Sequence, residues 1–219
     1  MVTGRFDVYG FIGAGIGLLV GMIGHELSHA WIAVRRGDQT ARFMGRLTLN
    51  PKVHVDPFGT LVMPAIFLVS ILFNANVGFF VFGYAKPVTT HPERMRQPRR
   101  DAILVALAGP AFNLFVVAVI GFLSRSIPAT SNLWIVLFWI AVSNTFLFVI
   151  NILPIPPLDG SKILARFLSP SAAARMDDWG QYLILFLIVL FLVFRGVVGA
   201  IAAAIYEPIL GLPRLLVTG

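Results

Sequence analysis

The sequence predicts an all-α polytopic membrane protein with about four full transmembrane helices, a re-entrant segment and a short β-hairpin-like element. Of its 219 residues, 58% are hydrophobic and only 12% are charged, and its mean hydropathy is +0.85. Several apolar runs also reach the ~20 residues that a transmembrane helix requires. No polar stretch is long enough for a separate soluble domain, so we expect residues 1–219 to form a single membrane-embedded domain.

Four apolar runs have the length of full spans, and they cover about 8–34, 102–124, 132–153 and 180–206. A fifth run, 58–83, contains Pro64 and is interrupted by polar residues, and each loop beside it carries five Lys or Arg residues. Such bases are enriched in cytoplasmic loops. We therefore expect 58–83 to enter the membrane and return, although a run of this length also suits a tilted span.

The segment 41–56 lies between the first span and this fifth run. It is rich in β-forming residues around Leu47–Leu49, and Asn50-Pro51 is a turn signal, so a short hairpin is predicted there.

The composition also excludes several functions. The chain has no cysteine, which excludes disulfides and thiol catalysis. The net charge of +7 lies mainly in the loops between apolar runs, where positive-inside topology explains it. We therefore expect the lipid bilayer as a partner and no nucleic acid.

The first span contains His25-Glu26-Leu27-Ser28-His29. Ionisable residues within a transmembrane helix are energetically costly and usually functional. Residues four apart on an α-helix lie on the same face, so both imidazoles point the same way, with Glu26 beside them. In this arrangement two histidines bind zinc and a glutamate handles the proton of a metal-activated water. The pattern predicts a metal-dependent hydrolase that works within the membrane.

A catalytic zinc site has three protein ligands, so one more is required. Asp159 is the leading candidate, because it follows the 132–153 span in a proline-rich segment that stops a helix and exposes backbone groups. Asp159-Gly160 is also a turn dipeptide in its own right. His54 and Asp56, near the cytoplasmic end of the first span, are alternative third ligands.

Longer stretches of the chain resemble the site-2 protease family (peptidase M50) of intramembrane zinc metalloproteases, in particular its small prokaryotic members without PDZ or CBS domains. The matching segments are HELSHA at 25–30, GRLTLNPKVHVDPFGTL at 45–61, GYAKPV at 83–88, PRRDAILVALAGPAFN at 98–113 and NILPIPPLDG at 151–160. They follow the family order over most of the chain. The most specific feature is HExxH combined with Asn-x₇-Asp-Gly on a later span.

The resemblance implies a role for each matching residue. His25, His29 and Asp159 would bind Zn²⁺, and Glu26 would be the catalytic general base. The implied substrate-binding residues are Asn151, Asn113 and Gly109. Asn151 would hold the substrate backbone, whereas Gly109 and Asn113, in a Gly-x-x-x-Asn pattern with Pro110, would pack beside the site.

The expected function is zinc-dependent hydrolysis of peptide bonds in or near transmembrane segments of a membrane protein or peptide. We expect it in the prokaryotic cell membrane, with the active site towards the cytoplasmic side. A substrate helix must unwind to expose its amides, and 45–49 and 79–85 are the candidate strands that would pair with it. The alternative is a membrane metal-ion transporter with the same His/His/Asp site, and the requirement for Glu26 as a base distinguishes the two.

Overall fold

A computed structural model describes residues 8–50, 53, 89–156 and 158–178, with the isolated positions 182, 200, 201, 204, 205, 208 and 209. Three of the helices in these residues are long and apolar enough to cross a membrane: α1 (Val8–Arg36), α5 (Pro98–Ser124) and α6 (Asn132–Ile152). The shorter helices are α2 (Thr40–Phe43), η2 (Pro92–Arg94), α7 (Asp159–Ala165) and α8 (Pro170–Asp178).

The three long helices confirm the spans predicted at 8–34, 102–124 and 132–153. The predicted re-entrant run 58–83 lies outside the described residues, as does 180–206 apart from a few isolated positions. No strand occurs in the described part of the chain, which is mostly helical.

Local sequence signals set the ends of α5 and α6. α5 begins with Pro98, whose missing N–H costs nothing at a first helical position, and the Asp101 carboxylate accepts the N–H of Gln97 at 2.9 Å. The Ser131 hydroxyl caps α6 by accepting the N–H of Trp134 at 3.1 Å. α6 ends at Ile152, and the next residue, Leu153, adopts extended backbone before the first proline of the following segment.

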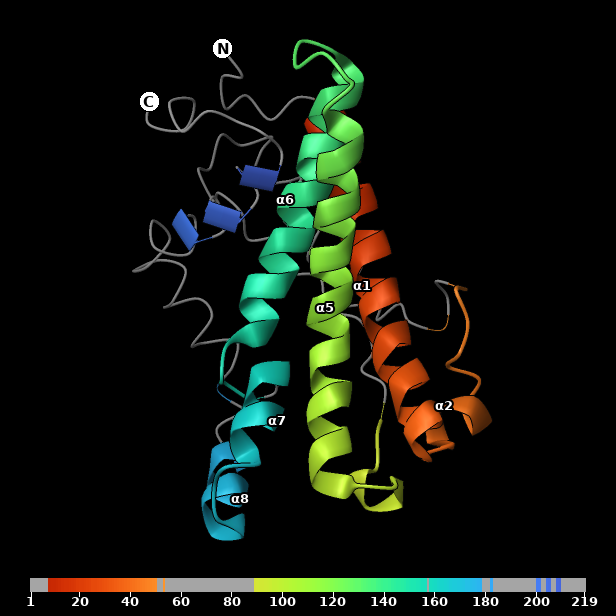
Figure 1. Ribbon diagram of the computed structural model, residues 1–219, viewed down its shortest axis with the longest axis vertical. Helices are drawn as coiled ribbons and strands as arrows, with labels where there is room; N and C mark the ends of the chain where they lie inside the picture. Colours follow the sequence, from red (N-terminus) through yellow and green to blue (C-terminus); the bar gives the residue numbers. More distant parts are fainter. Residues whose placement is uncertain are drawn as a thin grey trace.

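α1, α5 and α6 pack against one another as a bundle in which α5 runs antiparallel to the other two (Figure 1). The face of α1 that meets α6 is lined by glycines, which let two helix backbones approach closely. A Cβ atom on Gly17 would lie 2.8 Å from the Cα atom of Ile140. These glycines are Gly10, Gly13, Gly17 and Gly21. The close α1–α6 contact fixes the depth of α1 residues relative to the end of α6.

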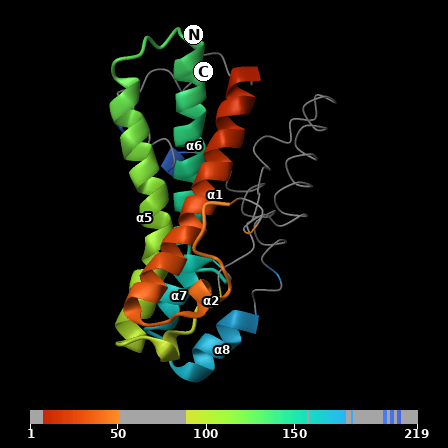
Figure 2. The ribbon, with the colours of Figure 1, turned by 90° about the vertical axis from the view of Figure 1, so that its right-hand side faces the viewer.

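The C-terminal end of α1, the N-terminal end of α5, α7 and α8 all lie at one end of the bundle (Figures 1 and 2). The N–H of Arg96 donates to the carbonyl of Arg36 at 2.9 Å, which joins the two basic loops directly. The chain therefore leaves α1 and enters α5 at the same end. The elements at this end carry the basic residues Arg35, Arg36, Arg99, Arg100, Lys162 and Arg175. We call this the basic end of the bundle.

The hairpin predicted for 41–56 does not form in its described part. Residues 40–43 are helical, and Ala41 packs against Ala30 of α1. Gly45 has φ +65°, and residues 45–50 are turns and irregular backbone rather than the predicted strand 45–49. The β-forming side chains are overridden because Asp38 bonds the N–H of Thr40 and starts a helical turn. The other candidate strand, 79–85, lies outside the described residues.

Asp38 ties the end of α1 to the segment before α5. Its Oδ1 accepts the N–H of Thr40 at 3.0 Å, and its Oδ2 accepts the N–H of His91 at 2.6 Å. Burial acts to raise the pKa of this carboxyl, but the hydrogen bonds from Thr40 and His91 outweigh it, so the pKa lies below its ordinary value of 3.8.

We expect Asp38→Asn to lower the free energy of unfolding by about 2 kcal/mol, because charge-assisted hydrogen bonds are lost and an amide donor faces backbone donors. Since the folded-state pKa is depressed, the stabilisation is present above the ordinary pKa and is lost as the pH falls through the folded-state value. Thermal unfolding of wild type and variant in detergent, between about pH 3 and pH 7, measures this. A Tm difference that stays constant over this range would contradict the assignment.

Candidate metal centre

α1 places His25 and His29 one turn apart on the face that meets α5. Both side chains are buried, and their rings meet edge to face with centroids 4.6 Å apart. At 1.5 Å per residue, the two histidines lie roughly 10 to 16 Å before the last residue of α1. Both histidines therefore lie in the C-terminal half of α1, away from its end.

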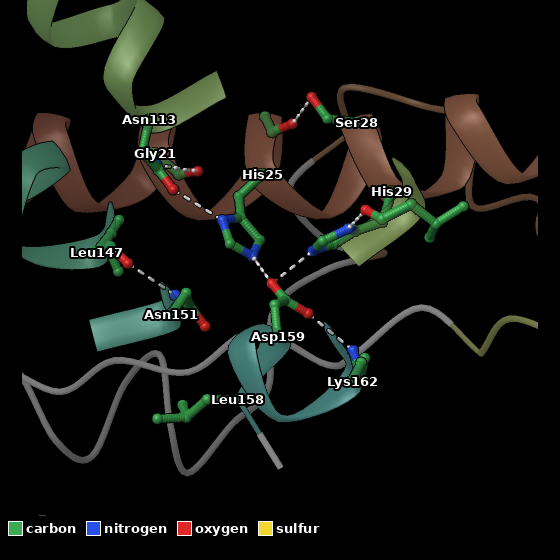
Figure 3. Close-up of polar contacts among 12 residues, drawn as sticks. Gly21, His25, Ser28, His29, Asn113, Leu147, Asn151, Leu158, Asp159 and Lys162 are labelled. Carbon is green, nitrogen blue, oxygen red and sulfur yellow. Dashed lines mark hydrogen bonds and ion pairs between the residues drawn. The ribbon is translucent and has the colours of Figure 1, made fainter. Parts of the chain in front are cut away.

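Asp159, the first residue of α7, reaches both histidines (Figure 3). Its Oδ2 lies 2.9 Å from Nε2 of His25 and 2.9 Å from Nε2 of His29. Its Oδ1 accepts a hydrogen bond from Nζ of Lys162 at 2.8 Å. In the described part of the chain, these three residues offer ligand atoms that all lie within 4.8 Å of one another and could hold a metal ion. Residues 134 positions apart in sequence thus meet at one point.

The position of Asp159 depends on Gly160. A Cβ at Gly160 would overlap the carbonyl oxygens of Ile152 and Leu153 at the end of α6. Only glycine lets α7 approach the end of α6 this closely, and the approach turns Asp159 towards α1. The Asp-Gly pair is therefore more than a turn signal.

Each imidazole is oriented by a second hydrogen bond at Nδ1. His29 Nδ1 lies 2.6 Å from the backbone oxygen of Val105, and His25 Nδ1 lies 2.7 Å from Oδ1 of Asn113. Both partners are oxygen acceptors, so Nδ1 carries the proton in each ring. A neutral imidazole in this tautomer presents its lone pair at Nε2.

Three electron-pair donors therefore converge: two Nε2 atoms and a carboxylate oxygen. Such a group is stable only when a cation lies among its members, either an added proton on an imidazole or a metal ion. Two histidines and one carboxylate are a common donor set of catalytic zinc sites, which leave one position open. The residues present therefore fit a zinc ion.

Gly109 of α5 leaves the space beside this group. A Cβ atom at Gly109 would lie 2.5 Å from Nε2 of His25 and 2.5 Å from Nε2 of His29. Any side chain here would occupy the region at which both ligand atoms point. The site therefore requires glycine at position 109.

The remaining predicted residues are placed as follows. Glu26 is half-buried and is not part of the ligand group. Asn151 lies in the last turn of α6, and its Nδ2 donates to the carbonyl of Leu147 at 2.9 Å (Figure 3). The rival third ligands, His54 and Asp56, lie outside the described residues.

The sequence reasoning did not single out Lys162 as a partner of Asp159. Its ammonium group fixes the carboxylate oxygen that does not contact the histidines. The spacing of three residues on one short helix is the signal that could have found it.

A bundle of apolar helices that buries a His/His/Asp group, with both histidines from one HExxH helix, defines the class of membrane-embedded metalloproteins with a zinc-type site. Residues 117–194 match the model of peptidase family M50. The "Putative zinc metalloprotease YwhC" of Bacillus subtilis is 35% identical over 197 residues, which cover 83% of this chain and 80% of that protein. The chain belongs to peptidase family M50, the site-2 protease family, and is a zinc metalloprotease.

Two mycobacterial relatives are longer than this chain. The "Putative zinc metalloprotease Rip2" of Mycobacterium tuberculosis is 35% identical over 178 residues, covering 80% of this chain and 65% of that protein. The "Putative zinc metalloprotease Rip3" of the same species is 28% identical over 166 residues, covering 74% of this chain and 33% of that protein. The chain therefore spans less than two thirds of the length of either. No solved structure gives a significant match.

Proposed function

We propose that this zinc metalloprotease hydrolyses peptide bonds in or near the transmembrane segments of membrane proteins, at a site formed by His25, His29 and Asp159. The observation that carries the proposal is the depth of this group, which is buried in a bundle of apolar helices roughly 10 to 16 Å from its basic end. A soluble substrate has no reason to reach that depth, whereas a membrane-inserted segment lies there already. Positive-inside topology supports a basic end in the cytoplasm, in a prokaryotic cell membrane.

Peptide hydrolysis at this site needs the three metal ligands and the general base Glu26. His25, His29 and Asp159 would hold the zinc ion, which would supply Lewis acidity to activate a water molecule and polarise the substrate carbonyl. Glu26, next to His25 on α1, accepts the proton as the water oxygen bonds to the carbonyl carbon. It then passes that proton to the amine nitrogen as the C–N bond breaks.

The expected roles of Asn151 and Gly109 in substrate binding are kept in this proposal. Asn151 holds the backbone of the unwound substrate segment, and Gly109 keeps the space beside the ligands open. Asn113 takes a different role from the one first expected. It is fully buried, and both ends of its amide are already bonded, to His25, Gly21 and Asn144, so it positions His25 rather than contacting substrate.

The test is cleavage of a purified single-span membrane protein by this protein in detergent. Products are mapped by mass spectrometry before and after treatment with a zinc chelator, and again after zinc is restored. We expect cuts within or next to the span, lost with the chelator and recovered with zinc. Cuts confined to loops far from the span, or cleavage that resists the chelator, would contradict the proposal. A transporter would bind zinc without cutting the substrate.

A further inference from the structure

Asn144 of α6 is a fully buried polar residue whose hydrogen bonds go to Gly17, Ile140 and Asn113. Its Nδ2 donates to the backbone oxygens of Gly17, at 3.1 Å, and Ile140, at 2.9 Å. Its Oδ1 accepts from Nδ2 of Asn113 at 3.1 Å. The bond to Gly17 joins α6 to α1. Its other bond, however, leads towards the metal centre.

Backbone oxygens determine which atom donates in each hydrogen bond from Asn144 through Asn113 to His25. The carbonyls of Gly17 and Ile140 can only accept, so the nitrogen of the Asn144 amide must face them and its oxygen must face Asn113. The nitrogen of Asn113 must then face both Asn144 Oδ1 and the carbonyl of Gly21, at 3.2 Å. Only the oxygen of Asn113 remains for His25, 2.7 Å away.

We propose that Asn144 is a positioning residue for the metal site, which acts through Asn113 to hold His25 in the tautomer that presents Nε2 to the metal. This inference rests on the proposed role of His25 as a ligand. A flipped Asn113 amide would point its nitrogen at Nδ1, and the imidazole proton would move to Nε2, the ligand atom. Asn144 and Gly21 both oppose that flip, since each would then face an oxygen with an oxygen.

Asn144 gives the Asn113 amide a second hydrogen-bond acceptor. The carbonyl of Gly21 alone supplies a single bond to hold the Asn113 amide, whereas two acceptors engage both of its N–H groups. A network with every donor and acceptor satisfied is rigid. Removal of the second acceptor leaves the orientation of Asn113, and hence the protonation of His25, less tightly defined.

The experiment measures zinc dissociation constants of purified full-length protein by competition with a chelator, without reference to proteolysis. Asn144→Leu has a similar shape but no acceptor, and Asn144→Ala serves where leucine does not fold. We expect both to weaken zinc binding about tenfold, at the low end of effects seen for groups that orient metal ligands. Cobalt-substituted protein should show an altered visible absorption spectrum in the same variants.

The matched control is Ser143→Ala, which removes a neighbouring hydrogen bond from α6 to α1, at 3.4 Å, without any link to Asn113. It should bind zinc within about twofold of wild type. The Asn113→Ala background has no amide to orient, so Asn144→Leu should have no further effect on zinc binding there. That result separates positioning through Asn113 from general loosening of the bundle, which would persist in both backgrounds.

Zinc affinity in both Asn144 variants equal to that of Ser143→Ala would overturn this inference and leave the proposed metal site intact. An Asn144→Leu effect of the same size in both Asn113 backgrounds would overturn it as well. A wild-type protein that binds no zinc would overturn the proposed function itself.

Discussion

Replacement of Glu26 with glutamine is expected to reduce peptide-bond cleavage by about 10²- to 10⁴-fold, the range typical of a lost general base. The amide cannot take the proton of the attacking water or return it to the leaving amine. Zinc content should remain at the wild-type level, because Glu26 is not one of the residues whose ligand atoms converge. The combination of retained zinc and lost cleavage is the signature of a catalytic base.

Zinc content by elemental analysis and cleavage of a single-span substrate are measured on the same Glu26→Gln preparation. Ser28→Ala, two residues further along α1, is the matched control, and the Ser28 hydroxyl donates to the carbonyl of Gly24 at 2.6 Å. It should retain both zinc and activity, which also excludes a serine nucleophile. Cleavage that persists in Glu26→Gln would show that another group is the base.

A methyl group at Gly109 is expected to remove the metal site while the bundle still folds. The Cβ of Gly109→Ala would lie 2.5 Å from Nε2 of both histidines, too close for any non-bonded contact. The helix α5 must then shift away from α1, or the imidazoles must turn aside. We expect zinc affinity to fall about 100-fold or more, and cleavage to be lost with it.

Gly15→Ala on α1 provides the control, since a Cβ there meets nothing within 4 Å. Both substitutions replace glycine by the best helix former, which favours each helix by about 1 kcal/mol. Gly15→Ala should therefore keep its zinc and unfold at the wild-type temperature or above. Chelator competition measures the zinc affinity of both variants. Equal affinity in the two would show that Gly109 is not beside the metal.

The parts of the molecule that depend on local sequence could be predicted. The apolar lengths fix three spans, and the four-residue spacing of His25 and His29 places them on one helix face whatever surrounds them. The role of Asp159 could not be predicted from local sequence alone, because its own segment does not indicate which side chains it contacts. The proline-rich break and the family resemblance supplied that link, and the convergence of the three ligand atoms is consistent with it.

The rest depends on contacts between distant residues. The predicted strand at 45–49 fails because hydrogen bonds from Thr40 and His91 to Asp38 organise the chain after α1, and β-propensity carries no information about them. Likewise, no sequence pattern indicates that the amides of Asn113 and Asn144, 31 residues apart, face each other. Which face of α5 meets α1 is decided by packing, so the closeness of Gly109 to both histidines appears only in three dimensions.

The most direct test of the proposed site is the zinc content of Asp159→Asn compared with wild type, both purified in detergent and dialysed against the same weak chelator. We expect one zinc per wild-type chain and strongly reduced zinc in the variant, because an amide is a poor substitute for the carboxylate that faces both histidines. Full zinc retention in Asp159→Asn would contradict the account and transfer the third ligand position to another residue, with His54 and Asp56 the first to be tested.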